Sequence, residues 1–289
     1  MALIKTLRYN NDSIFRLVLF SAALLILVIC SGIILALVSG SFDAFREYGF
    51  FRFIVSDKWN VSNGSELEYG ALPFITGTLY TSLLAIAICI PFALSVALFT
   101  GEYFRNTTMA KILGNGINML ACVPSVVYGL WGFYTLRPLM INLNISSQGL
   151  GIFTSSVVLA VMVIPYAASL SSQYIQLVPD ELKECAYSLN ATRLEVIKTV
   201  ILPYSRSGIV SSFMLALGRA LGETMAVTML IGNTNNIPVA LSDTGNTMAS
   251  IIANQFGEAD GIKLSSLMAI GLILFIITMI INFIGRKLT

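Results

Sequence analysis

Six long apolar stretches constrain the fold of this 289-residue chain more than any other feature. A helix that crosses a bilayer needs about 20 apolar residues, because the hydrocarbon core is roughly 30 Å thick and each residue rises about 1.5 Å. Charged residues make up only 11% of the chain, against about 25% in soluble domains. We therefore expect an all-α integral membrane protein with six transmembrane helices. The apolar windows lie at residues 17–39, 74–99, 112–136, 151–172, 209–232 and 264–285.

The chain divides after its first apolar window. That window is too long for a signal peptide, so we expect residues 1–72 to hold a retained helix and an extracytoplasmic loop over 40–72. Residues 73–289 are then a five-helix bundle. Aromatic residues of the loop, such as Trp59, either anchor it at the membrane interface or help to seat an extracytoplasmic partner. Placing both termini in the cytoplasm leaves most loop lysines and arginines on that side, which predicts a multi-pass protein of the cytoplasmic (inner) membrane with this orientation.

Several chemistries are excluded by what the sequence lacks. It contains no histidine and no glycine-rich phosphate-binding loop with its lysine. Its four cysteines are Cys30, Cys89 and Cys122 in apolar windows and Cys185 in a cytoplasmic loop, and they are expected to be small apolar filler. We expect no enzymatic site, no bound metal and no cofactor on this chain. The net charge of +2 reflects membrane topology and does not indicate a nucleic-acid partner.

The cytoplasmic segment 173–208 is too long for a simple link between two helices. Its apolar residues recur at spacings of three and four, which predicts two short helices separated near Asn190. Asn190 tolerates the left-handed backbone conformation that ends a helix. Asp180 and Glu181 give the first helix an acidic start, and Pro203 is expected to stop the second.

The fifth apolar window carries two ionisable residues, Arg219 and Glu223. Charges at such a depth are costly and usually mark a pathway or a site. In a continuous helix the spacing of four residues places both on one face, where each lowers the burial cost of the other. One interpretation is a structural ion pair. The other is a pathway for a tetrahedral oxyanion, because a guanidinium suits the oxygens of phosphate and stays charged at physiological pH.

Three prolines lie inside apolar windows, at Pro91, Pro124 and Pro165. Each removes a backbone hydrogen bond and tends to kink its helix. They are either tolerated kinks or hinges. The glycines Gly114, Gly116, Gly129 and Gly132 are expected to allow close helix approach.

The cytoplasmic segment resembles the loop by which permeases of ATP-binding-cassette (ABC) importers engage their ATPases. That loop reads Glu-Ala-Ala, three residues, Gly, nine residues, Ile, one residue, Leu-Pro. This chain departs from it at three positions, Cys185, Asn190 and Val200. The resemblance implies the type I ABC importer permease fold with a cytoplasmic coupling helix. By position, coupling to the ATPase falls to Glu184, Cys185, Ala186, Asn190, Leu202 and Pro203.

The run from Gly218 to Met229 resembles the signature of the membrane permease subunits of phosphate-specific ABC importers, and it fits the first of their two homologous subunits better. The likeness covers about residues 55–260. It implies ATP-driven import of inorganic phosphate, with Arg219, Glu223 and Thr224 on the substrate pathway. The implied partners are a second homologous permease, a dimer of ATPase subunits that bind ATP and Mg, an extracytoplasmic phosphate-binding protein and membrane lipid.

Other functions compete with phosphate import. Within the importers, the substrate is alternatively phosphonate, sulfate or molybdate. An ion-coupled secondary transporter also places charges at mid-membrane, but it usually has internal repeats or broken helices and leaves the segment 173–208 without a partner. A purely structural membrane scaffold leaves Arg219 and Glu223 without a purpose.

Overall fold

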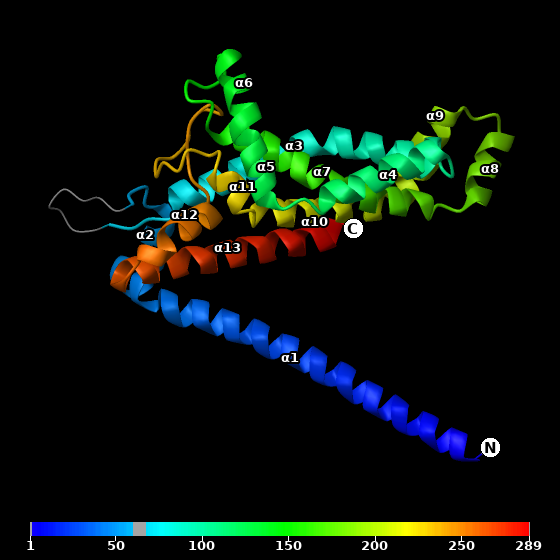
Figure 1. Ribbon diagram of the computed structural model, residues 1–289, viewed down its shortest axis with the longest axis horizontal. Coiled ribbons are helices and arrows are strands. Elements are labelled where there is room, and N and C mark those ends of the chain that lie inside the picture. The colour runs from blue at the N-terminus through cyan, green and yellow to red at the C-terminus, as the bar shows by residue number, and fades with distance from the viewer. Residues whose placement is uncertain (1, 60–67, 289) are drawn as a thin grey trace.

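The fold is a bundle of helices with one long helix, α1, that diverges from it (Figure 1). The computed structural model describes residues 2–59 and 68–288. Over these residues it contains isolated β-bridges and no strands. The longer elements are α1 (Ala2–Tyr48), α2 (Phe50–Val55), α3 (Leu72–Leu98), α4 (Thr108–Ala121), α5 (Ser125–Trp131), α6 (Arg137–Asn142), α7 (Ile152–Gln176), α8 (Asp180–Ser188), α10 (Leu202–Leu221), α12 (Met248–Gln255) and α13 (Gly261–Leu288).

The shorter elements mark bends and junctions. There are π-helical turns at η1 (Phe99–Tyr103), η2 (Gly132–Leu136) and η3 (Ile197–Ile201), and a 3-10 turn at η4 (Phe256–Glu258). Two α-helices are very short, α9 (Arg193–Val196) and α11 (Met225–Thr228).

Five of the six apolar windows correspond to helices long and apolar enough to cross a membrane. These spans are Phe15–Tyr48, Leu72–Tyr103, Ile152–Gln176, Arg193–Leu221 and Gly261–Lys287. The sixth, around residues 112–136, is a pair of helices that meet at an angle of 95°. The predicted all-α membrane fold is confirmed, with five spanning helices among the described residues, or six if the bent pair counts as one span.

Helix α7 forms the centre of the bundle and packs against α3, α4 and α10. Ser155 and Ser156 of α7 are buried. Their hydroxyls are paired, because each donates to a carbonyl one turn earlier, at 2.9 and 2.7 Å. Small residues of this kind let helices approach closely in a membrane.

The bend between α4 and α5 lies at Cys122–Pro124, where Pro124 precedes the first residue of α5. Proline has no N–H to continue the helical ladder, so the chain breaks there. Pro91 and Pro165 lie inside α3 and α7, which continue through them.

The four glycines of this region differ in their surroundings. A Cβ at Gly129 would meet Met229, and one at Gly132 would meet Leu230 and Val158, each at 2.7 Å. The prediction of close helix approach is confirmed there. It is wrong for Gly114 and Gly116, which have no neighbouring atoms within 4 Å of such a Cβ.

Much of the described part of segment 40–72 is helical, where we expected an extracytoplasmic loop. Helix α1 continues to Tyr48, and α2 follows it. Trp59 and Tyr69 are only 6% and 3% exposed and stack edge to face, while the Trp59 indole donates to Gln255 at 3.1 Å. These aromatic side chains are core residues between α3 and α12, so an interfacial anchor is the wrong interpretation for them. The sequence Ser62-Asn63-Gly64-Ser65 favours a turn, and it lies outside the described residues.

Candidate functional site: a docking loop and a polar route through the bundle

The segment that resembles a coupling loop forms the tip of the bundle, with α8 lying across its end (Figure 1). Helix α8 begins at Asp180 after Pro179, as the acidic start predicted. It ends before Asn190, whose φ of 64° is the left-handed conformation that the sequence predicted. Asparagine tolerates this region better than other non-glycine residues.

The second half of the segment differs from the prediction, because Pro203 does not end a helix. Thr192 and Glu195 form a reciprocal cap at the start of α9, and the helix then runs through η3 into α10. In the wider π turn the Leu202 N–H donates to the Ile197 carbonyl. Pro203 therefore lies inside a continuous helix, and the π turn directly before it changes the hydrogen-bond ladder where the proline has no N–H to donate.

The predicted coupling residues separate into two groups. Glu184, Cys185 and Asn190 are exposed on the outer surface of the tip, together with Leu182, Tyr187 and the 85% exposed Leu189. Ala186 and Leu202 instead pack against the buried cluster around Val196 and Ile201. The first group forms an accessible surface, and the second holds α8 against the helices behind it. Pro203 is exposed on α10.

Ion pairs that the sequence did not predict fasten α8 to η1 at the end of α3. The Lys183 ammonium lies 2.8 Å from a Glu102 carboxylate oxygen, and the two side chains are 7% and 9% exposed. Asp180 lies 2.9 Å from the Arg105 guanidinium and 3.2 Å from the Lys183 ammonium. The Lys183 hydrogen bond, followed by the charge of Arg105, lowers the pKa of Asp180. The signal in the sequence was Glu102, an acid directly after an apolar window.

Arg193 adds a further contact at the same place. Its guanidinium donates to the carbonyls of Glu102 and Tyr103, at 3.3 and 2.6 Å, and lies 4.2 Å from the centre of the Tyr103 ring. The tip of the bundle, formed by the segment 173–208, is thus linked to η1 by both α8 and α9.

The predicted helix through Arg219 and Glu223 is broken between them. Helix α10 ends at Leu221, and α11 starts only at Met225, so the premise of one continuous face is wrong. Gly222 is the C-cap of α10, with φ −93° and ψ 0°. Glu223 accepts a hydrogen bond from the Ala226 N–H at 3.3 Å, and Thr224 donates to the Gly222 carbonyl at 3.3 Å. Over the described residues, Arg219 and Glu223 form no ion pair.

Arg219 instead lies over an aromatic ring of the central helix. Its guanidinium carbon is 4.1 Å from the centre of the Tyr166 ring, a cation–π contact. The hydroxyl of Tyr166 donates to the Ala121 carbonyl at 3.3 Å, and that of Tyr128 donates to Leu120 at 2.9 Å. Both acceptors lie at the end of α4, directly before the bend. The sequence did not single out either tyrosine, because their spacing to Arg219 carries no pattern.

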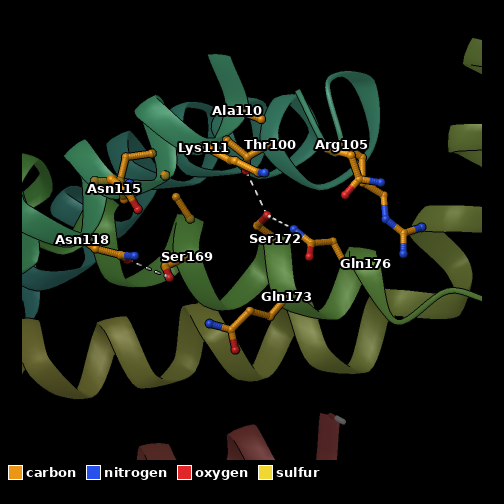
Figure 2. Close-up of a pocket in the computed structure, with 14 residues that line it drawn as sticks. Thr100, Arg105, Ala110, Lys111, Asn115, Asn118, Ser169, Ser172, Gln173 and Gln176 are labelled. Carbon is orange, nitrogen blue, oxygen red and sulfur yellow. Dashed lines mark hydrogen bonds between the residues drawn. The ribbon is translucent and has the colours of Figure 1, made fainter. Parts of the chain in front are cut away.

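A polar cavity of about 470 Å³ lies between α4 and α7 (Figure 2). Arg105 and Lys111 supply positive charge, and hydroxyl and amide side chains supply most of the remaining polar surface. Ser172 of α7 shares a 2.9 Å hydrogen bond with Thr100 of η1, and Ser169 of α7 donates to Asn118 of α4 at 3.3 Å. No acidic side chain lines it among the described residues.

With this geometry in place, comparison with known proteins assigns the family. The model described as "binding-protein-dependent transport system inner membrane component" matches residues 89–288. The chain belongs to this family. It is therefore a membrane permease component of a transport system that uses a binding protein.

Curated relatives align over nearly the whole chain. The phosphate transport system permease protein PstC of Mesorhizobium japonicum is 39% identical, covering 96% of this chain and 89% of the relative. The protein of the same name from Pasteurella multocida is 39% identical, covering 98% and 94%. That of Haemophilus influenzae is 37% identical, covering 98% and 96%.

Solved structures share the fold at low sequence identity. A structure of inward-facing conformations of the MetNI methionine ABC transporter has a TM-score of 0.58 at 17% identity, covering 76% of this permease component and 94% of that chain. A bacterial ABC transporter involved in import of the acidic polysaccharide alginate has a TM-score of 0.56 at 15% identity, covering 75% and 79%. Both support the type I importer permease fold.

Proposed function

We propose that this chain is the permease subunit of an ATP-driven importer that moves inorganic phosphate across the cytoplasmic membrane. The observation that carries the proposal is the near full-length similarity to proteins named phosphate transport system permease PstC. The chemistry of the site agrees with it. Arg219 supplies a permanent positive charge with a planar set of donors, which suits an oxyanion in any protonation state.

The geometry supports a revised arrangement of the predicted pathway residues. Arg219 is held by the Tyr166 ring, and it is exposed on this chain. Glu223 and Thr224 belong to the break between α10 and α11. A break in a spanning helix exposes backbone groups that can solvate a passing ion. We assign substrate contact to Arg219 and place Glu223 and Thr224 at the bend beside it.

The assembly follows from the docking tip. Because the chain carries no nucleotide-binding loop, ATP and Mg belong to partner ATPase subunits, and the exposed residues of α8 are the surface they contact. A second homologous permease completes the pathway beside Arg219, and an extracytoplasmic binding protein delivers phosphate. The orientation with both termini in the cytoplasm puts α8 on the ATPase side, and the chain itself binds no cofactor.

The test is ATP-dependent uptake of labelled phosphate by the complete reconstituted complex, with unlabelled phosphate, sulfate, phosphonate and molybdate as competitors. We expect phosphate to compete strongly and the others weakly. Preferential competition by sulfate, phosphonate or molybdate would reassign the substrate. Uptake that persists without ATP but follows an ion gradient would contradict the importer mechanism itself.

A further inference from the structure

The cavity between α4 and α7 has the composition of an anion site. Its wall combines two cations with side-chain amides and hydroxyls, and no carboxylate lines it among the residues the structure describes. A cleft lined by one sign of charge concentrates ions of the opposite sign. Of the two cations, Arg105 is already paired with Asp180 at 2.9 Å, whereas Lys111 has no ion-pair partner over the described residues.

The polar residues of the cavity form two facing rows. On α4 they are Lys111, Asn115 and Asn118, at spacings of four and three. On α7 they are Ser169, Ser172 and Gln176, at spacings of three and four. Such spacings put each row on one side of its helix. Figure 2 shows the labelled members of both rows around the same space.

The α7 row continues towards Arg219. Tyr166, which lies under the Arg219 guanidinium, precedes Ser169 by three residues on α7. Ser169 in turn bonds Asn118 across the two helices. At its other end, the cavity reaches Arg105, which contacts the first residue of the docking helix α8. The polar surface therefore links the proposed substrate contact with the docking tip.

We propose that this cavity is a binding station for inorganic phosphate on the cytoplasmic side of Arg219, with Lys111 as its cationic contact and Asn115 and Asn118 as neutral donors. The inference rests on the proposed function. A volume of about 470 Å³ leaves room for water beside the anion, so the anion keeps much of its hydration. Weak, partly hydrated binding suits a station that must also release its ion.

The test uses accessibility of an introduced thiol in the complete complex, placed in nanodiscs of zwitterionic lipid. Gly114→Cys puts the thiol in the cavity wall without removing a proposed contact, since Gly114 lines the cavity and an added Cβ there meets no atom within 4 Å. Peptide mass spectrometry follows this position separately from the native cysteines. Two small thiol reagents of the same size, one anionic and one cationic, are compared. We expect the anionic reagent to be favoured, and phosphate to slow its reaction more than chloride does at equal ionic strength.

Variants of Lys111 test whether its charge causes the preference for the anionic reagent. Lys111→Gln is expected to lower the ratio of anionic to cationic labelling by about fivefold, because it removes a nearby unit charge. Lys111→Arg keeps that charge and should keep the ratio. Lys287→Gln, near the C-terminal end of α13, is the matched control and should leave it unchanged. Equal ratios in Lys111→Gln and the parent, or no slowing by phosphate, would overturn the proposal.

Two further arms identify which phosphate-bearing molecule occupies the cavity. If an anionic lipid in the nanodisc protects the thiol and phosphate does not, the cavity binds a lipid headgroup and the proposal is wrong. Uptake assays on the unsubstituted complex test the proposed function independently. If those uptake assays contradict phosphate import while phosphate still protects the thiol, the proposed function is wrong and the cavity is still an oxyanion site.

Discussion

The ammonium of Lys183 on the docking helix lies 2.8 Å from the Glu102 carboxylate in η1, and both side chains are almost completely buried. A buried ion pair does little for stability compared with well-packed apolar residues, but removing one partner leaves an uncompensated charge. This pair therefore fixes where α8 sits relative to the end of α3. A movement of the docked helix would be carried directly to the bundle.

We expect Glu102→Gln to lower the stability of the purified complex by less than the roughly 3–5 kcal/mol that a wholly unpaired buried charge costs, because Lys183 keeps Asp180 at 3.2 Å. The double change Glu102→Gln with Lys183→Met removes that charge and should recover most of the loss. Thermal unfolding measures both. Arg52→Gln is the control, since its ion pair with Glu68 is exposed and such pairs contribute little. Equal effects of the buried and exposed changes would contradict this account.

Charge reversal on the docking surface should weaken the contact with the ATPase. Glu184 is exposed on α8, so Glu184→Lys changes the surface without disturbing the core behind it. We expect less ATPase to copurify and uptake to fall in parallel. Glu258→Lys, an equally exposed reversal in η4, is the matched control. Full copurification with Glu184→Lys would remove this residue from the docking surface.

Variants of Arg219 and Tyr166 distinguish two roles of the arginine, which are to supply positive charge and to present a planar set of donors. Arg219→Lys keeps the charge but loses the planar fork, so uptake should fall while complex yield stays normal. Tyr166→Phe keeps the ring and should transport nearly as well as the parent. Tyr166→Leu loses the cation–π contact, about 0.5–1 kcal/mol at an exposed site. Uptake by Arg219→Lys at the parental rate would show that the fork does not contact the substrate.

The lowered pKa of Asp180 predicts a pH dependence at the docking tip. Its carboxylate is stabilised in the folded state mainly by the Lys183 hydrogen bond, so its contribution is complete above its ordinary pKa of 3.8. The contribution is lost as the pH falls through the lower folded value. Thermal unfolding from pH 3 to pH 7 should show a stability difference between the parent and Asp180→Asn that shrinks towards the acid end. A difference that grows with acidity would reverse the assigned sign.

Sequence periodicity predicted the spanning helices because burial in lipid demands long apolar runs whatever the tertiary contacts are. It also predicted the left-handed Asn190, since that preference is local. The π turn before Pro203 and the break before Glu223 were missed. Both depend on how the chain adjusts a few hydrogen bonds within an otherwise apolar stretch, which composition does not reveal.

The candidate site was predictable in part. The exposed Glu184 and the arginine in the fifth window carry signals of their own, through a motif and through charge in an apolar run. Tyr166 and Lys111 do not, because their importance comes from partners in other helices. Glu102 carries only the weak signal of an acid just after an apolar window, and its buried partner Lys183 is far away in the sequence. Burial of Trp59 and Tyr69 was missed for the same reason. A segment rich in aromatic residues looks the same in the sequence whether its rings face the membrane interface or pack against a neighbouring helix.

The interruption between Leu221 and Met225 also affects which insertions this protein can tolerate during evolution. In an unbroken helix, inserting one residue rotates everything beyond it by about 100°, since a turn holds 3.6 residues. Within residues 222–224, an added residue can be absorbed as a slightly longer bend. A change of length at this interruption leaves unchanged the register of α10 and of the segment 173–208 at its other end, whereas Ala226, Val227 and Leu230 beyond it stay fixed in the core.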